Sequence, residues 1–203
     1  YFGYLAINSD DLGNISSLEV AEQNETDYNE ASQAILSTNW QRFHDATGLG
    51  RLNGPNDSQP RARRSYVGGW FDGIGRSVAV ANYGTNGGAV VERPDLAPER
   101  SDTVLVSTTH YKGDGQANAT MDPESIETRW DNDAAGRRIR LIENYQSCSS
   151  EPDANRVTEF AYAPDGGLER LTLINAVTGN QVTRWVFGTT RLDSEVATSN
   201  LLR

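Results

Sequence analysis

A short turn unit recurs along the chain and constrains the fold more than any other feature of the sequence. In its clearest copy, an aromatic residue precedes an aspartate, a glycine follows three residues after the aspartate, and an arginine comes directly after that glycine. Four copies contain the key residues Phe71, Asp72, Gly75 and Arg76; Tyr111 and Gly115; Asp133, Gly136 and Arg137; Tyr162 and Gly166. Glycine supplies the positive φ of a tight turn, and an aspartate can accept hydrogen bonds from the turn amides. The unit therefore predicts a β-hairpin at each copy.

The segments that flank these turns have the composition of β-strands. Alternating or β-branched residues fill the segments 104–109, 138–142, 171–174 and 182–187. At 138–141 the alternation is strict, which places arginines on one face of a strand and aliphatic side chains on the other. We therefore expect a mainly β fold, in which residues 62–203 form an antiparallel meander with loop insertions at 50–60 and 84–100.

The first 61 residues carry a weaker form of the pattern. Two segments, 10–14 and 44–49, resemble degenerate copies of the turn. Between them, alanine and leucine residues recur at a helix-compatible spacing, which predicts a short helix near 26–43. We therefore divide the chain into an N-terminal region of degenerate repeats or irregular structure, 1–61, and a repeat meander, 62–203.

Charge and composition argue against several classes of function. The chain has 18 Lys and Arg against 28 Asp and Glu, a formal net charge of −10. A nucleic-acid-binding protein needs a basic patch, so we expect no nucleic-acid partner. No apolar run approaches the roughly 20 residues of a membrane span, so we expect no membrane insertion. Four Trp, eight Tyr and five Phe supply large apolar groups for a core.

No residue set indicates catalysis, a cofactor or a metal, and we predict that the protein is not an enzyme. Cys148 is the single cysteine, which precludes an intrachain disulfide and a cysteine metal cluster. The two histidines, His44 and His110, lie in turn and strand patterns, where a half-buried structural role explains them. Residues 131–142 begin like a calcium loop but end in Ile142, where such a loop has Glu.

The repeated unit resembles the YD repeat of the RHS (rearrangement hotspot) family. The signature of that repeat is Tyr-Asp, two variable residues, Gly, usually Arg, and then a strand. The resemblance is carried by the segments 66–84, 105–124, 127–145 and 156–175. Lys112 and Ala163 replace the aspartate in two copies, and Asn132 replaces the aromatic in another, where Trp130 would take the place of the ring. The resemblance covers about 62–190 well and the N-terminal third weakly.

The family resemblance implies an architecture and a function. In RHS proteins, insecticidal toxin-complex proteins and teneurins, YD repeats build a long β-sheet that spirals into a hollow shell, often around a C-terminal toxin. The chain would then be a non-catalytic structural segment of a large secreted or cell-surface bacterial protein, with the rest of that polypeptide as its partner. It opens at Tyr1 without an initiator Met, so we expect a piece of a longer chain. The family's self-cleavage motif, Asp-Pro-x-Gly-Leu, is not matched, because Asp122-Pro123 is followed by Glu124-Ser125.

Two other interpretations of the same sheet stay open. If the tryptophans faced outward, they would form a sugar-stacking surface, and the chain would be a surface adhesion or carbohydrate-binding module for glycans; they are Trp40, Trp70, Trp130 and Trp185. If uncovered strand edges paired with identical chains, the chain would be a subunit of a self-assembling β filament.

Overall fold

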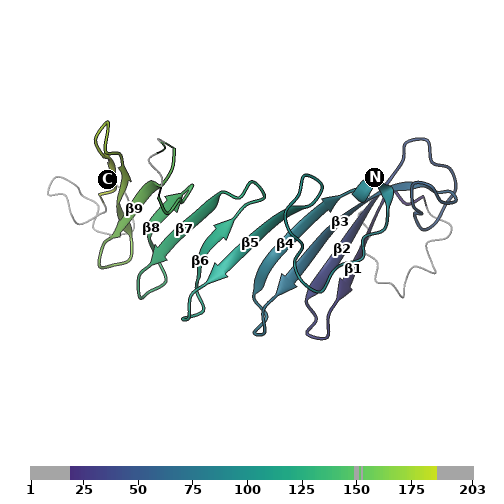
Figure 1. Ribbon diagram of the computed structural model, residues 1–203, viewed down its shortest axis with the longest axis horizontal. Coiled ribbons are helices and arrows are strands. Elements are labelled where there is room, and N and C mark those ends of the chain that lie inside the picture. Colours follow the sequence, from purple (N-terminus) through teal and green to yellow (C-terminus); the bar gives the residue numbers. More distant parts are fainter. Residues whose placement is uncertain (1–18, 149–150, 152, 187–203) are drawn as a thin grey trace, which may run out of the picture. The chain divides into compact units, whose positions relative to one another are not determined.

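A computed structural model describes residues 19–148, 151 and 153–186, and the regular secondary structure of this part of the chain is almost entirely β-strand (Figure 1). Eleven strands follow one another in chain order, and paired strands run antiparallel. The predicted mainly β hairpin meander is confirmed for these residues, whereas 10–14 and 187–203 lie outside them. The strands are β1 (Glu22–Tyr28), β2 (Ala34–Arg42), β3 (Ala62–Phe71), β4 (Ser77–Gly84), β5 (Leu105–Tyr111), β6 (Ala117–Met121), β7 (Glu127–Asn132), β8 (Arg138–Glu143), β9 (Arg156–Tyr162), β10 (Leu168–Ile174) and β11 (Gln181–Arg184).

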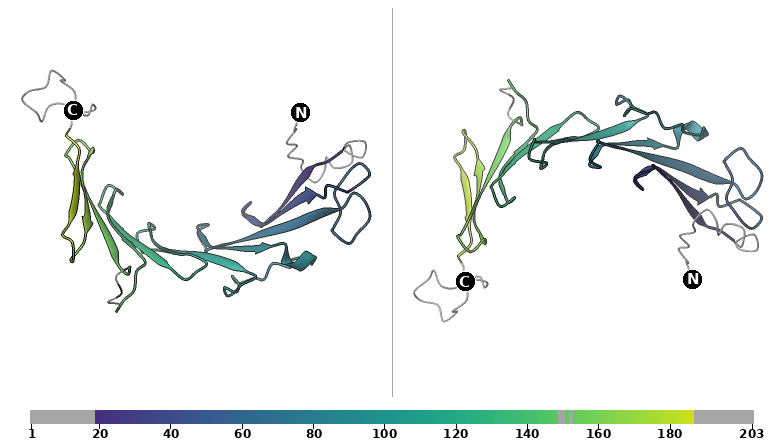
Figure 2. Two further views of the ribbon diagram at one scale, coloured as in Figure 1. Left: turned by 90° about the horizontal axis from the view of Figure 1, so that it is seen from above. Right: turned by 90° about the horizontal axis from the view of Figure 1, so that it is seen from below.

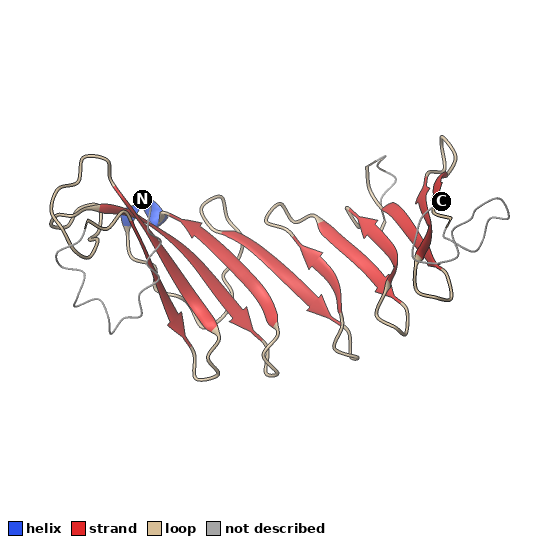
Figure 3. Ribbon diagram, turned by 180° about the vertical axis from the view of Figure 1, so that it is seen from behind, coloured by secondary structure: helices blue, strands red, loops and turns tan. Residues whose placement is uncertain are grey.

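The chain divides into two compact units, unit 1 (Tyr1–Thr108) and unit 2 (Thr109–Arg203). Unit 1 contains β1 to β4 and the part of β5 that pairs with β4. Unit 2 contains β6 to β11. Figure 3 distinguishes the strands of the described residues from the loops that join them. The boundary predicted near residue 61 rested on the likeness between repeats, and it stays a prediction.

Residues 26–43 form a hairpin, so the prediction of a short helix there was wrong. β1 and β2 pair along their length and are joined by a tight turn. Asn29 Oδ1 accepts hydrogen bonds from the amides of Ala31 (3.0 Å) and Gln33 (2.9 Å), which competes with helical bonding of the same amides. On β2 the chain is extended, and it buries Trp40 against the loop that follows.

In unit 1, one face of the sheet carries the core. Alternate residues of β3 and β4 are buried there, and the larger cluster comprises Tyr66, Trp70, Ala79, Ala81, Tyr83, Val91 and Val106. A second cluster comprises Trp40, Leu52 and Ala62. Leu52 belongs to the loop 43–61, and Val91 to the loop 85–104, which contains the one-turn 3-10 helix η2 (Asn86–Gly88) (Figure 2). The loop insertions predicted at 50–60 and 84–100 therefore contribute side chains to the core.

Unit 2 buries its side chains less deeply. Among its described residues, only Ala119 and Thr158 are buried, at 3% and 7% exposure. The connections that follow its even-numbered strands lie at 122–126, 144–155 and 175–180. Unit 2 is therefore a sheet of half-buried side chains held by strand pairing and turns. No helix that could cross a membrane is found among the described residues.

Candidate functional site

Among the described residues, six connections share the same five-residue turn, at 29–33, 72–76, 112–116, 122–126, 133–137 and 163–167. In each one, the first amide donates to the fifth carbonyl and the fourth amide donates to the first carbonyl, over N···O distances of 2.8–3.1 Å. The fourth residue always has a positive φ, between 60° and 91°. This is a type I turn closed by a left-handed residue, the standard three-residue hairpin loop with a bulge.

All eleven residues of the predicted repeat motif lie in these turns or directly before them. The aromatic residues Phe71, Tyr111 and Tyr162 end β3, β5 and β9. In the turns after β3 and β7, the first and fifth positions are held by Asp72 with Arg76 and by Asp133 with Arg137. The fourth position is held by Gly75, Gly115, Gly136 and Gly166.

Two of the six turns lie outside the four copies that the sequence motif marks. One is 29–33, where Asn29 replaces Asp and Ser32 takes the left-handed position at φ 60°. The other is 122–126, where Ser125 has φ 66°. Tyr28 directly before Asn29 repeats the aromatic-Asx pair, which is the signal that would have found the first copy. Residues 44–49, by contrast, lie in the loop 43–61.

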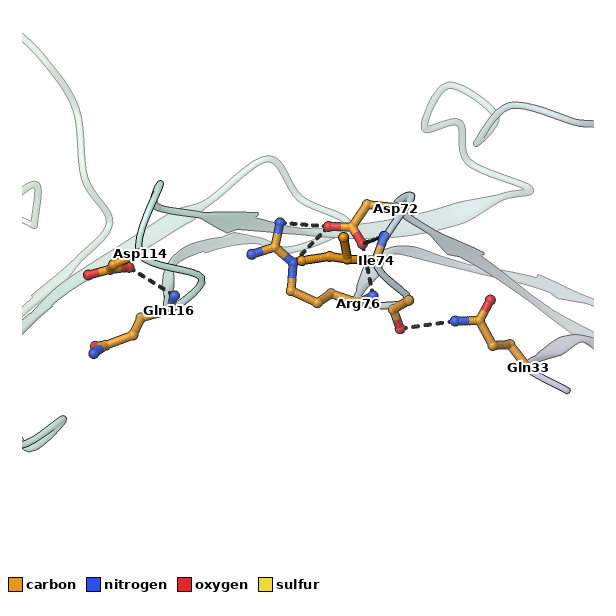
Figure 4. Close-up of polar contacts among 7 residues, drawn as sticks. Gln33, Asp72, Ile74, Arg76, Asp114 and Gln116 are labelled. Carbon is orange, nitrogen blue, oxygen red and sulfur yellow. Dashed lines mark hydrogen bonds and ion pairs between the residues drawn. The ribbon is translucent and has the colours of Figure 1, made fainter. Parts of the chain in front are cut away.

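Three of the turns are closed by an aspartate at the first position, and in two of them that aspartate also pairs with an arginine. In the third, Asp122 Oδ1 accepts hydrogen bonds from the amides of Glu124 (2.8 Å) and Ile126 (2.9 Å). Asp72 Oδ1 accepts hydrogen bonds from the amides of Ile74 (3.1 Å) and Arg76 (2.9 Å), and its Oδ2 pairs with the Arg76 guanidinium at 2.7 Å (Figure 4). Asp133 makes the equivalent bonds with Ala135 and Arg137, at 2.7–2.9 Å. The carboxylates of Asp72 and Asp133 therefore each link three groups of their own turn.

These bonds also stabilise the charged form of Asp72 and Asp133. The hydrogen bond from the Arg76 amide is the largest cause that lowers the pKa of Asp72, and the guanidinium of the same residue adds to it. For Asp133, the side-chain hydrogen bond from Arg137 is the largest cause of a lowered pKa. Both turns therefore keep their ion pair in mildly acidic solution.

Two further turns carry their aspartate at the third position instead. Asp114 Oδ1 accepts from the Gln116 amide at 2.9 Å (Figure 4), and Asp165 Oδ1 accepts from the Gly167 amide at 3.1 Å. The shifted aspartates explain how Lys112 and Ala163 can stand at the first position. In the 112–116 turn, contacts with β7 add support, through Lys112 Nζ to Asp131 (3.3 Å) and Asn132 Nδ2 to Gln116 Oε1 (2.9 Å).

Neighbouring hairpins contact one another through the side chains of the motif. In unit 2 the Arg137 guanidinium lies 4.6 Å from the centre of the Tyr162 ring, and Tyr162 Oη donates to the carbonyl of Arg138 at 2.8 Å. Arg138 in turn lies 4.7 Å from the Trp130 ring. In unit 1, Gln33 Nε2 of one turn donates to the Gly75 carbonyl of the next at 3.0 Å (Figure 4). The turns at 29–33 and 133–137 thus each contact the hairpin beside them.

The groups considered for other chemistry are dispersed. His44 and His110 are exposed, which corrects the expectation of a half-buried role, and Cys148 is exposed as well. No group of three or more His, Cys, Asp or Glu residues in the described part of the chain could hold a metal ion. Two depressions of about 360 and 460 Å³ in unit 2 share Glu127 and Arg129, which pair with each other at 2.7 Å.

The four tryptophans differ in exposure between the two units. Trp40 and Trp70 are 8% and 4% exposed and belong to the two core clusters of unit 1. Trp130 and Trp185, in unit 2, are half-buried. The sugar-stacking interpretation therefore loses Trp40 and Trp70 as contact residues.

Comparison with known proteins finds likenesses among solved structures alone. No family model and no curated protein matches the chain. Among solved structures 19 chains match, and one is the crystal structure of TcdB2-TccC3-TEV, at a TM-score of 0.32 and 9% sequence identity. The match covers 81% of this chain and 11% of that chain. This chain therefore spans about a tenth of the length of that structure, and the likeness is too low to bear on function.

Proposed function

We propose that this chain is a non-catalytic structural segment of a large secreted or cell-surface YD-repeat protein, in which it forms part of a β-shell or scaffold. The observation that supports this proposal is the five-residue turn that recurs six times with the same backbone hydrogen bonds. An enzyme site brings a few reactive side chains together in one place. In this chain the repeated feature is a way of turning the backbone and of holding the next hairpin.

The contacts between hairpins suit such a mechanical role. A lone two-stranded hairpin is marginally stable in water, so repeated hairpins depend on their neighbours. The stacking of Arg137 on Tyr162 and the bond from Gln33 to Gly75 provide that dependence at the turns. The partner of this segment is then the remainder of its own polypeptide, and a C-terminal toxin is the cargo that the family resemblance implies.

Analysis of the native species tests the proposal. Intact mass spectrometry and peptide sequencing should find a polypeptide several times longer than the 203 residues of this chain. Its additional peptides should repeat the aromatic-Asp-x-x-Gly unit. A native polypeptide of 203 residues, or a longer one without further copies, would contradict the role as a shell segment.

The two alternative functions predict different behaviour of the purified chain. Saturable quenching of tryptophan fluorescence by millimolar sugars would favour the adhesion module. A sedimentation coefficient that rises with protein concentration would favour the filament, because free strand edges would then pair between chains. For a segment of a β-shell, we expect sugars to leave the tryptophan fluorescence unchanged.

A further inference from the structure

Two tryptophan–arginine pairs lie on the buried face of unit 1, and one of them bonds its donors to the protein backbone. The Arg93 guanidinium lies 4.7 Å from the centre of the Trp70 ring. Trp70 Nε1 donates to the Pro94 carbonyl at 3.1 Å, and Arg93 Nε and Nη2 donate to the Gly69 carbonyl at 3.1 and 2.9 Å. The acceptors for this pair are backbone oxygens of the protein itself.

The second pair has the same stacking but lacks those acceptors. Arg64 lies 5.2 Å from the centre of the Trp40 ring, and the two residues stand directly opposite each other on β3 and β2. Arg64 Nη2 donates to the Gly88 carbonyl at 3.1 Å. Trp40 Nε1 and Arg64 Nε are buried and have no hydrogen-bond partner. Buried donors of this kind normally have an acceptor.

A third unpartnered donor comes from the same patch. Arg42 is two residues beyond Trp40 on β2, so its side chain lies on the same face, and that side chain is 10% exposed. Its Nη2 donates to the carbonyls of Ala46 (3.1 Å) and Gly48 (2.8 Å), and its Nε is 3.7 Å from Glu19. Arg42 Nη1 is buried without a partner.

We propose that Trp40, Arg42 and Arg64 form a binding site for a small oxyanion, that is, a phosphate, sulfate or carboxylate group. All three unpartnered groups are N–H donors, and two of them belong to guanidinium ions, which bind oxyanions through charge-assisted hydrogen bonds. Among the described residues, no carboxylate lies within 4.0 Å of the Arg64 guanidinium. An oxyanion would therefore supply both the acceptor atoms and the negative charge.

The position of the site links it to the two loops of unit 1. Arg42 holds carbonyls of the loop 43–61, and Arg64 holds a carbonyl of the loop 85–104. Since the three donor atoms are buried, the anion enters when the loop 43–61 opens. Once bound, it connects both loops to the sheet through the same two arginines.

The experiment follows the indole N–H signals of Trp40 and Trp70 in ¹H–¹⁵N spectra of the full chain. Sodium phosphate and sodium acetate are titrated separately against sodium chloride at equal ionic strength. The Trp40 signal should shift saturably with at least one of the two oxyanions and not with chloride. The Trp70 signal should stay in place, because its N–H already donates to Pro94. The titration that saturates identifies whether the site takes a phosphate or a carboxylate group.

Variants of neighbouring arginines separate binding from general salt effects. Arg64→Gln should raise the dissociation constant by about tenfold or more, since it removes a charged donor. If the glutamine variant fails to fold, Arg64→Lys takes its place in the test. It keeps the charge but removes the Nε donor, so it should also weaken binding. Arg63→Gln is the matched control, because Arg63 is exposed and points to the opposite face of β3. No saturable shift of Trp40, an equal shift of Trp70, or unchanged affinity in the folded Arg64 variant would overturn the proposal.

Discussion

Unit 1 and unit 2 use the same hairpin turns but bury their side chains to different extents. Among the described residues, eleven hydrophobic side chains are buried, and ten of them belong to unit 1; only Ala119 belongs to unit 2. Unit 1 has the loops 43–61 and 85–104, which contribute Leu52 and Val91 to its core clusters. The repeated turn is therefore enough to build a sheet, whereas long insertions are needed to cover one face of that sheet.

Unit 2 depends on contacts of another kind. Arginines stack on its aromatic rings, at 3.6 Å for Arg129 on Tyr145 and 4.6 Å for Arg137 on Tyr162. Such contacts at half-exposed sites contribute about 0.5–1 kcal/mol each, much less than a fully buried large side chain. We therefore expect core substitutions to reduce stability more in unit 1 than in unit 2. Turn substitutions should reduce stability in both units.

Removing a buried tryptophan should destabilise the protein most. Trp70→Ala should cost about 3–5 kcal/mol of unfolding free energy, because it leaves a cavity in the main core cluster of unit 1. Trp130→Ala in unit 2 should cost about 1–2 kcal/mol, since that ring is half-buried. Urea denaturation followed by far-UV circular dichroism measures both. Equal losses in the two variants would contradict the contrast between the units.

A smaller loss is expected where a left-handed glycine is replaced. Gly136 has φ 78°, and no atom lies within 4 Å of the position that a Cβ would take, so Gly136→Val introduces backbone strain and no steric clash at Cβ. We expect a loss of about 1–3 kcal/mol in urea denaturation. Gly113→Val is the control, because Gly113 lies in open space at the second turn position without a positive φ. If Gly136→Val melted within a degree of the wild type, the hairpin assignment would be wrong.

Acidification should weaken the two turns in which the first-position aspartate pairs with an arginine. The folded state lowers the pKa of Asp72 and Asp133, so their contribution is complete above the unfolded pKa of roughly 3.9 and is lost as the pH falls through the folded value. Urea midpoints measured from pH 6 to pH 2 should fall less steeply in Asp72→Asn and Asp133→Asn. Because the two turns lie in different units, the two variants should flatten the profile alike. Unchanged profiles would show that the ion pairs do not contribute.

A small gain in stability is expected at the serine turns. Ser32 and Ser125 have φ values of 60° and 66°, a conformation that glycine adopts without a steric penalty. Ser32→Gly and Ser125→Gly should each raise stability by about 0.5 kcal/mol in thermal unfolding. Ser37→Gly, in the middle of β2, should lower it instead. A gain in one unit and a loss in the other would mean that the turns are not equivalent.

The sequence predicts the hairpins well where glycine marks the turn. Gly75, Gly115, Gly136 and Gly166 all have the positive φ expected of them, since few other residues take that conformation freely. The hairpin at 26–43 was mistaken for a helix because Ser32, and not glycine, occupies the fourth position of its turn. Local spacing of alanine and leucine could not show that the residues of β2 pair with β3.

The contacts between distant residues could not be predicted from the repeat motif. A motif shows which residues turn the chain, but it does not show which distant groups meet. Arg93 lies on a loop 24 residues from the Gly69 carbonyl that it bonds, and nothing in its local sequence indicates this contact. The burial of Trp40 and Trp70 likewise depends on where the two loops of unit 1 lie.

Residue-resolved amide hydrogen exchange of the whole chain tests whether one turn geometry repeats along the sheet. In all six turns, the amides of the first and fourth residues are bonded within the turn. They should exchange slowly, including those of Asn29 and Ser32, which the sequence motif did not mark. The amide of Gly113, at the second position of its turn, should exchange fast. Fast exchange at the fourth position of several turns, or a helical protection pattern across 26–43, would contradict the repeated geometry.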